Sequence, residues 1–169
     1  MASITQANIQ TAVNAWVSDP TAAEATYGHI KDWNTSGVTS MSNLFFNKSN
    51  FNDDISGWDT SNVTNMRHMF EGASVFNVDI SGWDVSNVTD MINMFHRANA
   101  MDQLIKYWTP PSNTNFTNMF HTAAKMNQNQ GFPVTPNQSD FHRKPPILQA
   151  DIQTAIAAWI MSPTAAEAT

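Results

Sequence analysis

The sequence predicts an α/β solenoid of four strand–helix repeats, each about 25 residues long, with helical caps. The main observation is a strict sequence period, which is typical of repeat proteins. Tryptophan keeps this period, and so does phenylalanine: Trp33, Trp58, Trp83 and Trp108; Phe45, Phe70, Phe95 and Phe120. Isoleucine from Ile30 to Ile105 and threonine from Thr39 to Thr114 form two further columns. We expect the eight aromatic residues to form the structural core.

Residues 1–29 are predicted to form a helical N-terminal cap. Apolar residues recur there at helical spacing: Ile9, Ala12, Val13, Trp16 and Val17. Pro20 ends this helix, and the S/T-x-x-E pattern from Thr21 to Glu24 is typical of a capping box that starts a second helix. Such a cap is needed because the end of a solenoid otherwise exposes an apolar face.

Residues 30–132 are predicted to form the four-repeat solenoid. Asn62-Val63-Thr64 alternates polar and apolar residues, as a short strand does. The next column contains only preferred N-cap residues: Ser40, Asn65, Asp90 and Asn115. An apolar stripe then follows at helical spacing: Met66, Met69, Phe70 and Ala73. We therefore expect one parallel strand per repeat, spaced by about 4.8 Å, followed by a two-turn helix.

The repeat becomes irregular near the C-terminus. Residues 133–146 are rich in Pro and Asn, which favours a linker or an irregular cap. Residues 147–169 match residues 4–26 at 16 of 23 positions. This predicts a second cap-like helix, either a C-terminal cap or the start of a further module in a longer tandem array.

Composition excludes several classes of function. The net charge is −6, and the 8 Lys and Arg residues form no basic stripe, so we expect no nucleic-acid partner. The absence of Cys excludes disulfides, thiolate zinc sites and thiol nucleophiles. No signal peptide is evident at the N-terminus. The apolar stretch 147–160 is too short and polar to span a bilayer, so we expect no membrane insertion.

Two groups of residues suggest metal binding, and each has a simpler explanation. Glu71, His96 and His121 share one column, but helices that pack about 8–10 Å apart would keep them from a common ion. Four aspartates suggest calcium, but turns beside the tryptophans explain them better: Asp54, Asp59, Asp79 and Asp84. A further polar column is expected to satisfy loop backbone: Asn52, Asn77, Asp102 and Asn127. We predict no metal site and no cofactor.

The sequence offers no unique catalytic constellation. It contains no Ser-His-Asp arrangement and no phosphate loop, and its polar residues recur in successive repeats. A residue that every repeat carries is typical of architecture, whereas an active site is a unique cluster. We therefore expect no enzyme activity.

The motif W-D-[TV]-S-N-V-T-[ND]-M-x-x-M-F-x-x-A resembles the repeat of BspA-like leucine-rich-repeat surface proteins over residues 27–132. This resemblance implies a leucine-rich-repeat-like solenoid, a place on a surface, and attachment or protein binding rather than catalysis. The location it implies is extracellular, on a cell surface or a virion surface.

The outward face of the predicted strands is the candidate binding face. Its residues are Thr39, Asn62, Thr64, Asn87, Thr89, Ser112 and Thr114. We expect evenly spaced donors and acceptors that engage an extended peptide, a glycan or an ice lattice, unless the face is merely solvated. The leading hypothesis is a non-catalytic surface or interaction module that binds protein or glycan. The alternative is a structural component of a virion or extracellular assembly, with neighbouring subunits as partners.

Overall fold

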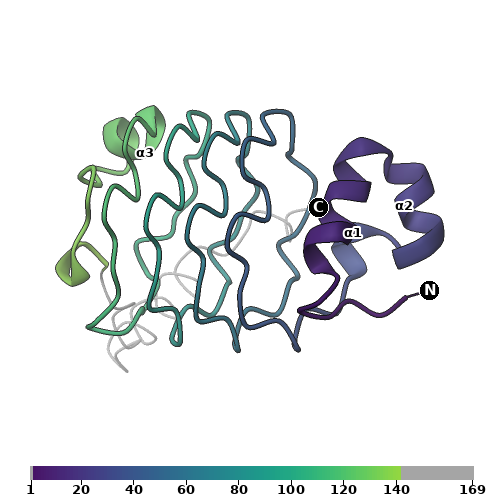
Figure 1. The fold of residues 1–169 in the computed structure, drawn as a ribbon. Helices are drawn as coiled ribbons and strands as arrows, with labels where there is room; N and C mark the ends of the chain where they lie inside the picture. The colour runs from purple at the N-terminus through teal and green to yellow at the C-terminus, as the bar shows by residue number, and fades with distance from the viewer. Residues whose placement is uncertain (1, 142–169) are drawn as a thin grey trace, which may run out of the picture.

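The structure is a computed structural model that describes residues 2–141. Helices α1 (Ile9–Ser18) and α2 (Pro20–Tyr27) lie at one end, followed by a 3-10 turn, η1 (Ile30–Asp32). Helix α3 (Ala124–Asn129) and the 3-10 turn η2 (Gln138–Asp140) lie at the other end (Figure 1). The predicted cap-like helix 147–169 lies outside the described residues, as do residues 142–146 of the predicted linker.

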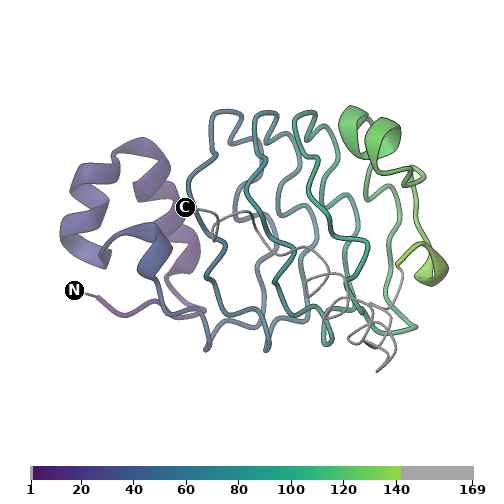
Figure 2. The same cartoon turned by 180° about the vertical axis from the view of Figure 1, so that it is seen from behind.

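Between the two ends, the chain winds into a stack of rungs, one for each repeat (Figures 1 and 2). Parallel bridges join the same position of successive rungs: Ser40 to Asn65, Asn65 to Asp90, and Asp90 to Asn115. Backbone amides extend this ladder, as the Met41 N–H donates to the Asn65 carbonyl at 2.8 Å. The Met66 N–H donates to the Asp90 carbonyl at the same distance. The period of the sequence is therefore the length of one rung.

The predicted α/β solenoid of strand–helix repeats, with its leucine-rich-repeat-like fold, is wrong. Within residues 2–141 the rungs meet through single bridging residues rather than strands, and turns replace the helix predicted after each N-cap residue. The reason is the distance between rungs. The rings of Phe45 and Phe70 are stacked with centroids 5.3 Å apart. An α-helix is about 10 Å wide with its side chains, so helices do not fit in a stack this tight.

The turn segment satisfies its backbone in two directions. The N–H groups of Asn43 and Phe45 donate to the next rung, to the carbonyls of Arg67 and Met69 at 3.0 and 2.9 Å. The N–H of Leu44, between them, instead donates within its own rung to the Met41 carbonyl at 3.4 Å. Every second backbone N–H of the segment therefore donates to a carbonyl of the neighbouring rung. A helix would have kept all of them local.

Two positions in each turn segment adopt left-handed backbone. The first position comprises Asn43, His68, Asn93 and Asn118, with φ between 54° and 61°. The second comprises Asn47, Gly72, Arg97 and Thr122, with φ between 56° and 72°. Gly and Asn tolerate this conformation best, which explains why they occupy five of these eight positions.

The aromatic columns form the core of the stack. All eight of the predicted core residues are buried, and none of the four tryptophans is more than 5% exposed. The last three indoles also join two rungs each: the Nε1–H groups of Trp58, Trp83 and Trp108 donate to the carbonyls of Ile30, Ile55 and Ile80, at 2.9, 3.3 and 3.2 Å. The tryptophan column therefore fixes register as well as filling the core.

The N-terminal cap covers the first rung. Helix α1 buries the side chains of Ile9, Ala12, Val13 and Trp16, as its pattern predicts. Helix α2 begins one residue before the expected capping box, with Pro20 at its first position. Its N-cap is Asp19, whose carboxylate accepts the Ala22 N–H at 3.1 Å. Proline suits this position because its missing N–H would have no helical partner there.

Gln6 completes the edge of the ladder, where no preceding rung exists. Its Oε1 accepts the Thr39 and Ser40 N–H groups at 2.9 and 2.8 Å, and its Nε2 donates to the Ser40 carbonyl at 3.0 Å. The amide side chain thus replaces the backbone of a rung.

At the other end, residues 132–141 pack against the last rung. The ring of Phe132 contacts that of Phe120 at a centroid distance of 4.9 Å, and Phe141 stacks on Phe116 at 5.1 Å. The Phe120 N–H donates to the Val134 carbonyl at 2.9 Å. The described part of the predicted linker therefore covers the open end of the stack.

Candidate functional site: an exposed face of Asn and Thr

The candidate face runs along the bridged side of the stack. Of its seven residues, six are exposed and Thr114 is half-buried. Asn62 and Asn87 occupy one column and Thr64 and Thr89 the next, separated by the buried valine column. The parallel bridges lie directly beside these columns, so equivalent side chains repeat at the spacing of the rungs. The backbone therefore brings the residues of the predicted face together.

Hydrogen bonds between rungs hold the asparagines of the face. Asn62 Nδ2 donates to the Ser36 carbonyl at 2.9 Å, and Asn87 Nδ2 donates to the Ser61 carbonyl at 2.8 Å. Each amide is thus tied to the preceding rung through its nitrogen. Neither Oδ1 accepts a hydrogen bond from residues 2–141.

The threonines follow the same arrangement. The Thr64 hydroxyl donates to the Thr39 carbonyl at 3.2 Å, and the Thr89 hydroxyl donates to the Thr64 carbonyl at 3.4 Å. These two hydroxyl donors therefore bind the preceding rung, whereas each asparagine Nδ2 keeps a second N–H, because a primary amide carries two. A hydroxyl that donates keeps its lone pairs. The face consequently presents more acceptors than donors, and its Asn, Thr and Ser members carry no charge.

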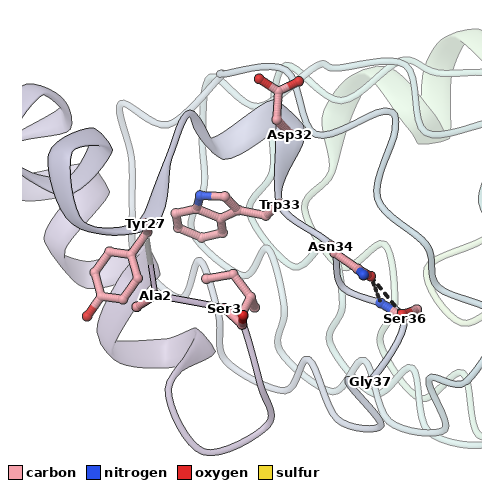
Figure 3. A pocket seen from close by; sticks show the side chains of 9 residues that line it. Ala2, Ser3, Tyr27, Asp32, Trp33, Asn34, Ser36 and Gly37 are labelled. Carbon is pink, nitrogen blue, oxygen red and sulfur yellow. Dashed lines mark hydrogen bonds between the residues drawn. The ribbon is translucent and has the colours of Figure 1, made fainter.

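Two hollows lie at the ends of this face. The first has a volume of about 400 Å³ at the junction of the cap and the first rung, and Tyr27, Trp33, Asn34 and Gly37 help to line it (Figure 3). The second has a volume of about 430 Å³ at the last rung, and Ser112 and Thr114 help to line it. Gly37 and Ser112 are the first and last members of the column that contains Asn62 and Asn87. The face therefore extends from one hollow to the other.

A chain of hydrogen bonds joins four titratable side chains on the turn side of the rungs. The Glu71 carboxylate contacts Nδ1 of His68 and, at 3.1 Å, Nδ1 of His96. His96 Nε2 in turn lies 3.2 Å from His121 Nδ1. The sequence-based reason for excluding contact is wrong, because the rings of His96 and His121 are only 4.9 Å apart. These side chains bond to one another, and none of the described His, Asp and Glu residues forms a group of three arranged to hold a metal ion.

His68 is not among the sequence candidates, because it belongs to the column of Asn43, Asn93 and Asn118 rather than to that of Glu71. Its left-handed backbone is shared with that column, but its ring reaches Glu71 three residues later. Histidine in an asparagine column is the signal that could have found it.

The aspartates beside the tryptophans form local turns, as expected. Asp54 and Asp59 each accept the backbone N–H and the hydroxyl of the serine two residues later, at distances from 2.6 to 3.0 Å. Asp79 accepts the Ser81 N–H at 2.9 Å. The serine hydroxyls, followed by the serine amides, lower the pKa of all three carboxyls.

These turns predict a loss of stability in acid. A carboxyl whose pKa is lowered by folding stabilises the protein above the ordinary pKa of about 4, and this contribution is lost as pH falls through the folded-state pKa. The thermal midpoint should change little from about pH 7 to 5 and fall below about pH 4. Replacing Asp54, Asp59 and Asp79 together by Asn should reduce that fall, because Asn34 makes the same turn with Ser36 without a charge. If the thermal midpoint of the triple variant falls as much below about pH 4 as that of the unsubstituted protein, this assignment is wrong.

The predicted ladder is confirmed for its first three members, whereas the Asn127 side chain instead donates to the Phe132 carbonyl at 2.8 Å. Asn52 Oδ1 accepts the Asn77 N–H, and Asn77 Oδ1 accepts the Asp102 N–H, both at 2.8 Å. Asp102 continues the ladder by accepting from Gln130 and Asn129, which lower the pKa of its carboxyl. This column serves the architecture of the stack.

These features define a tandem-repeat protein of stacked turns, with an uncharged face between two hollows. A family model described as "Mycoplasma protein of unknown function, DUF285" matches residues 11–132. The chain belongs to this family. No curated protein and no solved structure matches it. Among the described helices, none has the length and apolar character needed to cross a bilayer.

Proposed function

We propose that this protein is a non-catalytic binding module whose Asn and Thr face holds an extended glycan. The observation that carries the proposal is the excess of acceptors on the face: Asn62, Asn87, Thr64 and Thr89 each donate one hydrogen bond to the preceding rung and keep their own oxygen lone pairs as acceptors. The complementary ligand is an uncharged polymer rich in hydroxyl donors. A polysaccharide has this chemistry.

The spacing of the face favours a glycan over an extended peptide. Neighbouring backbone segments joined by parallel bridges lie about 4.8 Å apart, whereas an extended peptide rises about 3.3 Å per residue. Peptide groups laid along the stack would therefore drift out of register with the rungs. A pyranose ring linked through its opposite ends has a length comparable to one rung, so one sugar unit can lie on each rung.

A place on a cell surface is part of this proposal. It is supported by the resemblance of the repeat motif to BspA-like surface proteins. The recurrence of the face residues in successive rungs supports binding rather than catalysis, since catalysis needs a unique cluster of reactive groups.

The proposal is tested by binding neutral hexasaccharides to the whole chain. Cellohexaose, xylohexaose, mannohexaose and chitohexaose are titrated by calorimetry, and at least one should bind. Replacing Asn62 and Asn87 together by Leu should weaken that binding about thirtyfold, because two hydrogen bonds are lost and each contributes about 1 kcal/mol.

Asn50 and Asn99 provide the matched control. Both are exposed and lie outside the face, so replacing them together by Leu should leave the affinity unchanged. Circular dichroism checks that both double variants fold. If no hexasaccharide binds, or if the two double variants bind equally well, the glycan proposal is wrong, and a protein ligand becomes the hypothesis to test.

A further inference from the structure

The hollow at the N-terminal end of the stack differs from the rest of the face because the N-terminal cap supplies part of its lining. It lies where the segment from Ala2 to Ile4 and helix α2 meet the first rung, with a volume of about 400 Å³. This volume is within the range of small-molecule sites, which run from about 300 to 1,000 Å³. Tyr27 and Trp33 form one side of it, and Ser3 and Asn34 lie nearby (Figure 3).

The aromatic part of the hollow is held in place. The rings of Tyr27 and Trp33 meet edge to face at 6.1 Å. The Trp33 indole is further fixed by its Nε1–H, which donates to the Gly28 carbonyl at 2.9 Å. Trp33 is only 5% exposed and serves as a wall, whereas Tyr27 is half-buried and presents part of its ring. The site therefore needs no rearrangement of its aromatic side.

Three polar groups of the hollow have no hydrogen-bond partner in the described part of the chain. Within residues 2–141, the Ser3 hydroxyl, the Tyr27 hydroxyl and the Asn34 Nδ2 make no hydrogen bond. Asn34 is nevertheless held, because its Oδ1 accepts both the N–H and the hydroxyl of Ser36, at 3.0 and 2.7 Å. Its amide nitrogen is thus a positioned donor. An aromatic wall with a few placed donors and acceptors suits a sugar ring.

Gly37 connects the hollow to the face. It lines the hollow, and it also begins the column that continues through Asn62 and Asn87. A Cβ added at Gly37 would meet no atom within 4 Å, and its φ is not positive. Glycine is therefore not required there by the backbone. Because Gly37 has no side chain, the passage from the hollow to the face stays open at this rung, whereas the other rungs carry a side chain in the same column.

We propose that this hollow is the subsite for the terminal sugar ring of the glycan that lies on the Asn and Thr face. The inference rests on the proposed function, and it adds a direction: one end of the polymer is held beside Tyr27 and Trp33, and the chain leaves past Gly37. An uncharged monosaccharide should therefore bind the hollow on its own, more weakly than the polymer.

The test combines two measurements on the whole chain. The first is an NMR titration with the monosaccharide that makes up the bound hexasaccharide. It should shift the signals of Ser3, Tyr27 and Trp33 and leave those of Thr64 and Thr89 unchanged. The second is hexasaccharide affinity after Gly37→Leu, which should fall about tenfold or more, with a smaller loss for Gly37→Ala.

Gly82 supplies the matched control. A Cβ there also meets nothing within 4 Å, its φ is not positive, and it does not line the hollow, so Gly82→Leu should keep the affinity. If Gly37→Leu binds as tightly as Gly82→Leu, or if the monosaccharide shifts no signal of the hollow, the terminal subsite is wrong. In that case, weaker hexasaccharide binding by the Asn62 and Asn87 double variant would still support binding at the Asn and Thr face. Absence of any hexasaccharide binding overturns both proposals.

Discussion

Replacing Trp58 by alanine is expected to lower the free energy of unfolding by about 3–5 kcal/mol, the usual loss for a large aromatic truncation in a core. Trp58 is 3% exposed and lies in the middle of the stack. Its ring stacks on that of Trp33 at 6.0 Å and contacts that of Phe45 at 5.9 Å. Its Nε1–H also holds the preceding rung through the Ile30 carbonyl at 2.9 Å. The substitution therefore removes packing and a connection between rungs at once.

Urea unfolding followed by circular dichroism measures this loss. Trp58→Phe should cost less, because it keeps an aromatic ring in the stack and loses mainly the hydrogen bond to Ile30. Tyr107→Ala is the surface control, since Tyr107 is 39% exposed, and it should change stability by less than about 1 kcal/mol. A loss below about 1 kcal/mol for Trp58→Ala, the size of a surface effect, would show that the tryptophan column does not hold the stack together.

The repeat, its register and its core can all be predicted from the sequence, because each depends on the same strict period. The sequence predicts Ser40, Asn65, Asp90 and Asn115 as N-cap residues, and they are the residues that bridge the rungs. The chemistry of this prediction also holds in part: the side-chain oxygens of Asn65 and Asn115 accept an N–H two residues later, at 2.9 and 3.0 Å.

The structure has turns where a helix is expected after each of these residues, and the spacing of apolar residues along the chain does not distinguish the two. Met66, Met69, Phe70 and Ala73 are buried, as a helical stripe would be. The same spacing also suits a series of turns whose inward positions recur every three or four residues. The deciding quantity is the distance between rungs, which is a property of the whole stack. Among residues 2–141, seven non-glycine residues have positive φ, which is the local effect of that distance. The frequent Asn among them is the feature of the sequence that could have indicated it.

The candidate face is predictable because it repeats, whereas the contacts that distinguish its ends are not. Gln6 replaces a missing rung, and Tyr27 lines a hollow with Trp33, because the cap packs on the first repeat. Neither role follows from a spacing along the chain. Likewise, the direction of the Asn62 and Asn87 amides depends on carbonyls of the preceding rung.

Gly72→Ala is expected to lower the free energy of unfolding by about 2 kcal/mol or more, because strained backbone and steric overlap add together. Gly72 has φ +72°, and left-handed backbone costs a residue with a Cβ roughly 1–2 kcal/mol. The added Cβ would also overlap the Oδ1 of Asn47 and lie 3.3 Å from the α-carbon of that residue. Because the Gly72 N–H donates to the His96 carbonyl at 2.8 Å, and the Asn47 N–H donates to the Glu71 carbonyl at 2.7 Å, neither backbone can move without loosening the ladder.

A double-mutant cycle with Asn47→Gly separates the two causes. Asn47 has φ 56°, which glycine adopts without strain, so this substitution removes the overlapping oxygen while keeping the backbone. Gly72→Ala should therefore cost less in the Asn47→Gly background, where only the cost of positive φ and the short distance to the backbone of residue 47 remain. Urea unfolding of the four proteins gives the coupling energy. An equal cost in both backgrounds would mean that the Asn47 side chain moves aside freely, so that the rungs pack less tightly at this position than their ladder of hydrogen bonds requires.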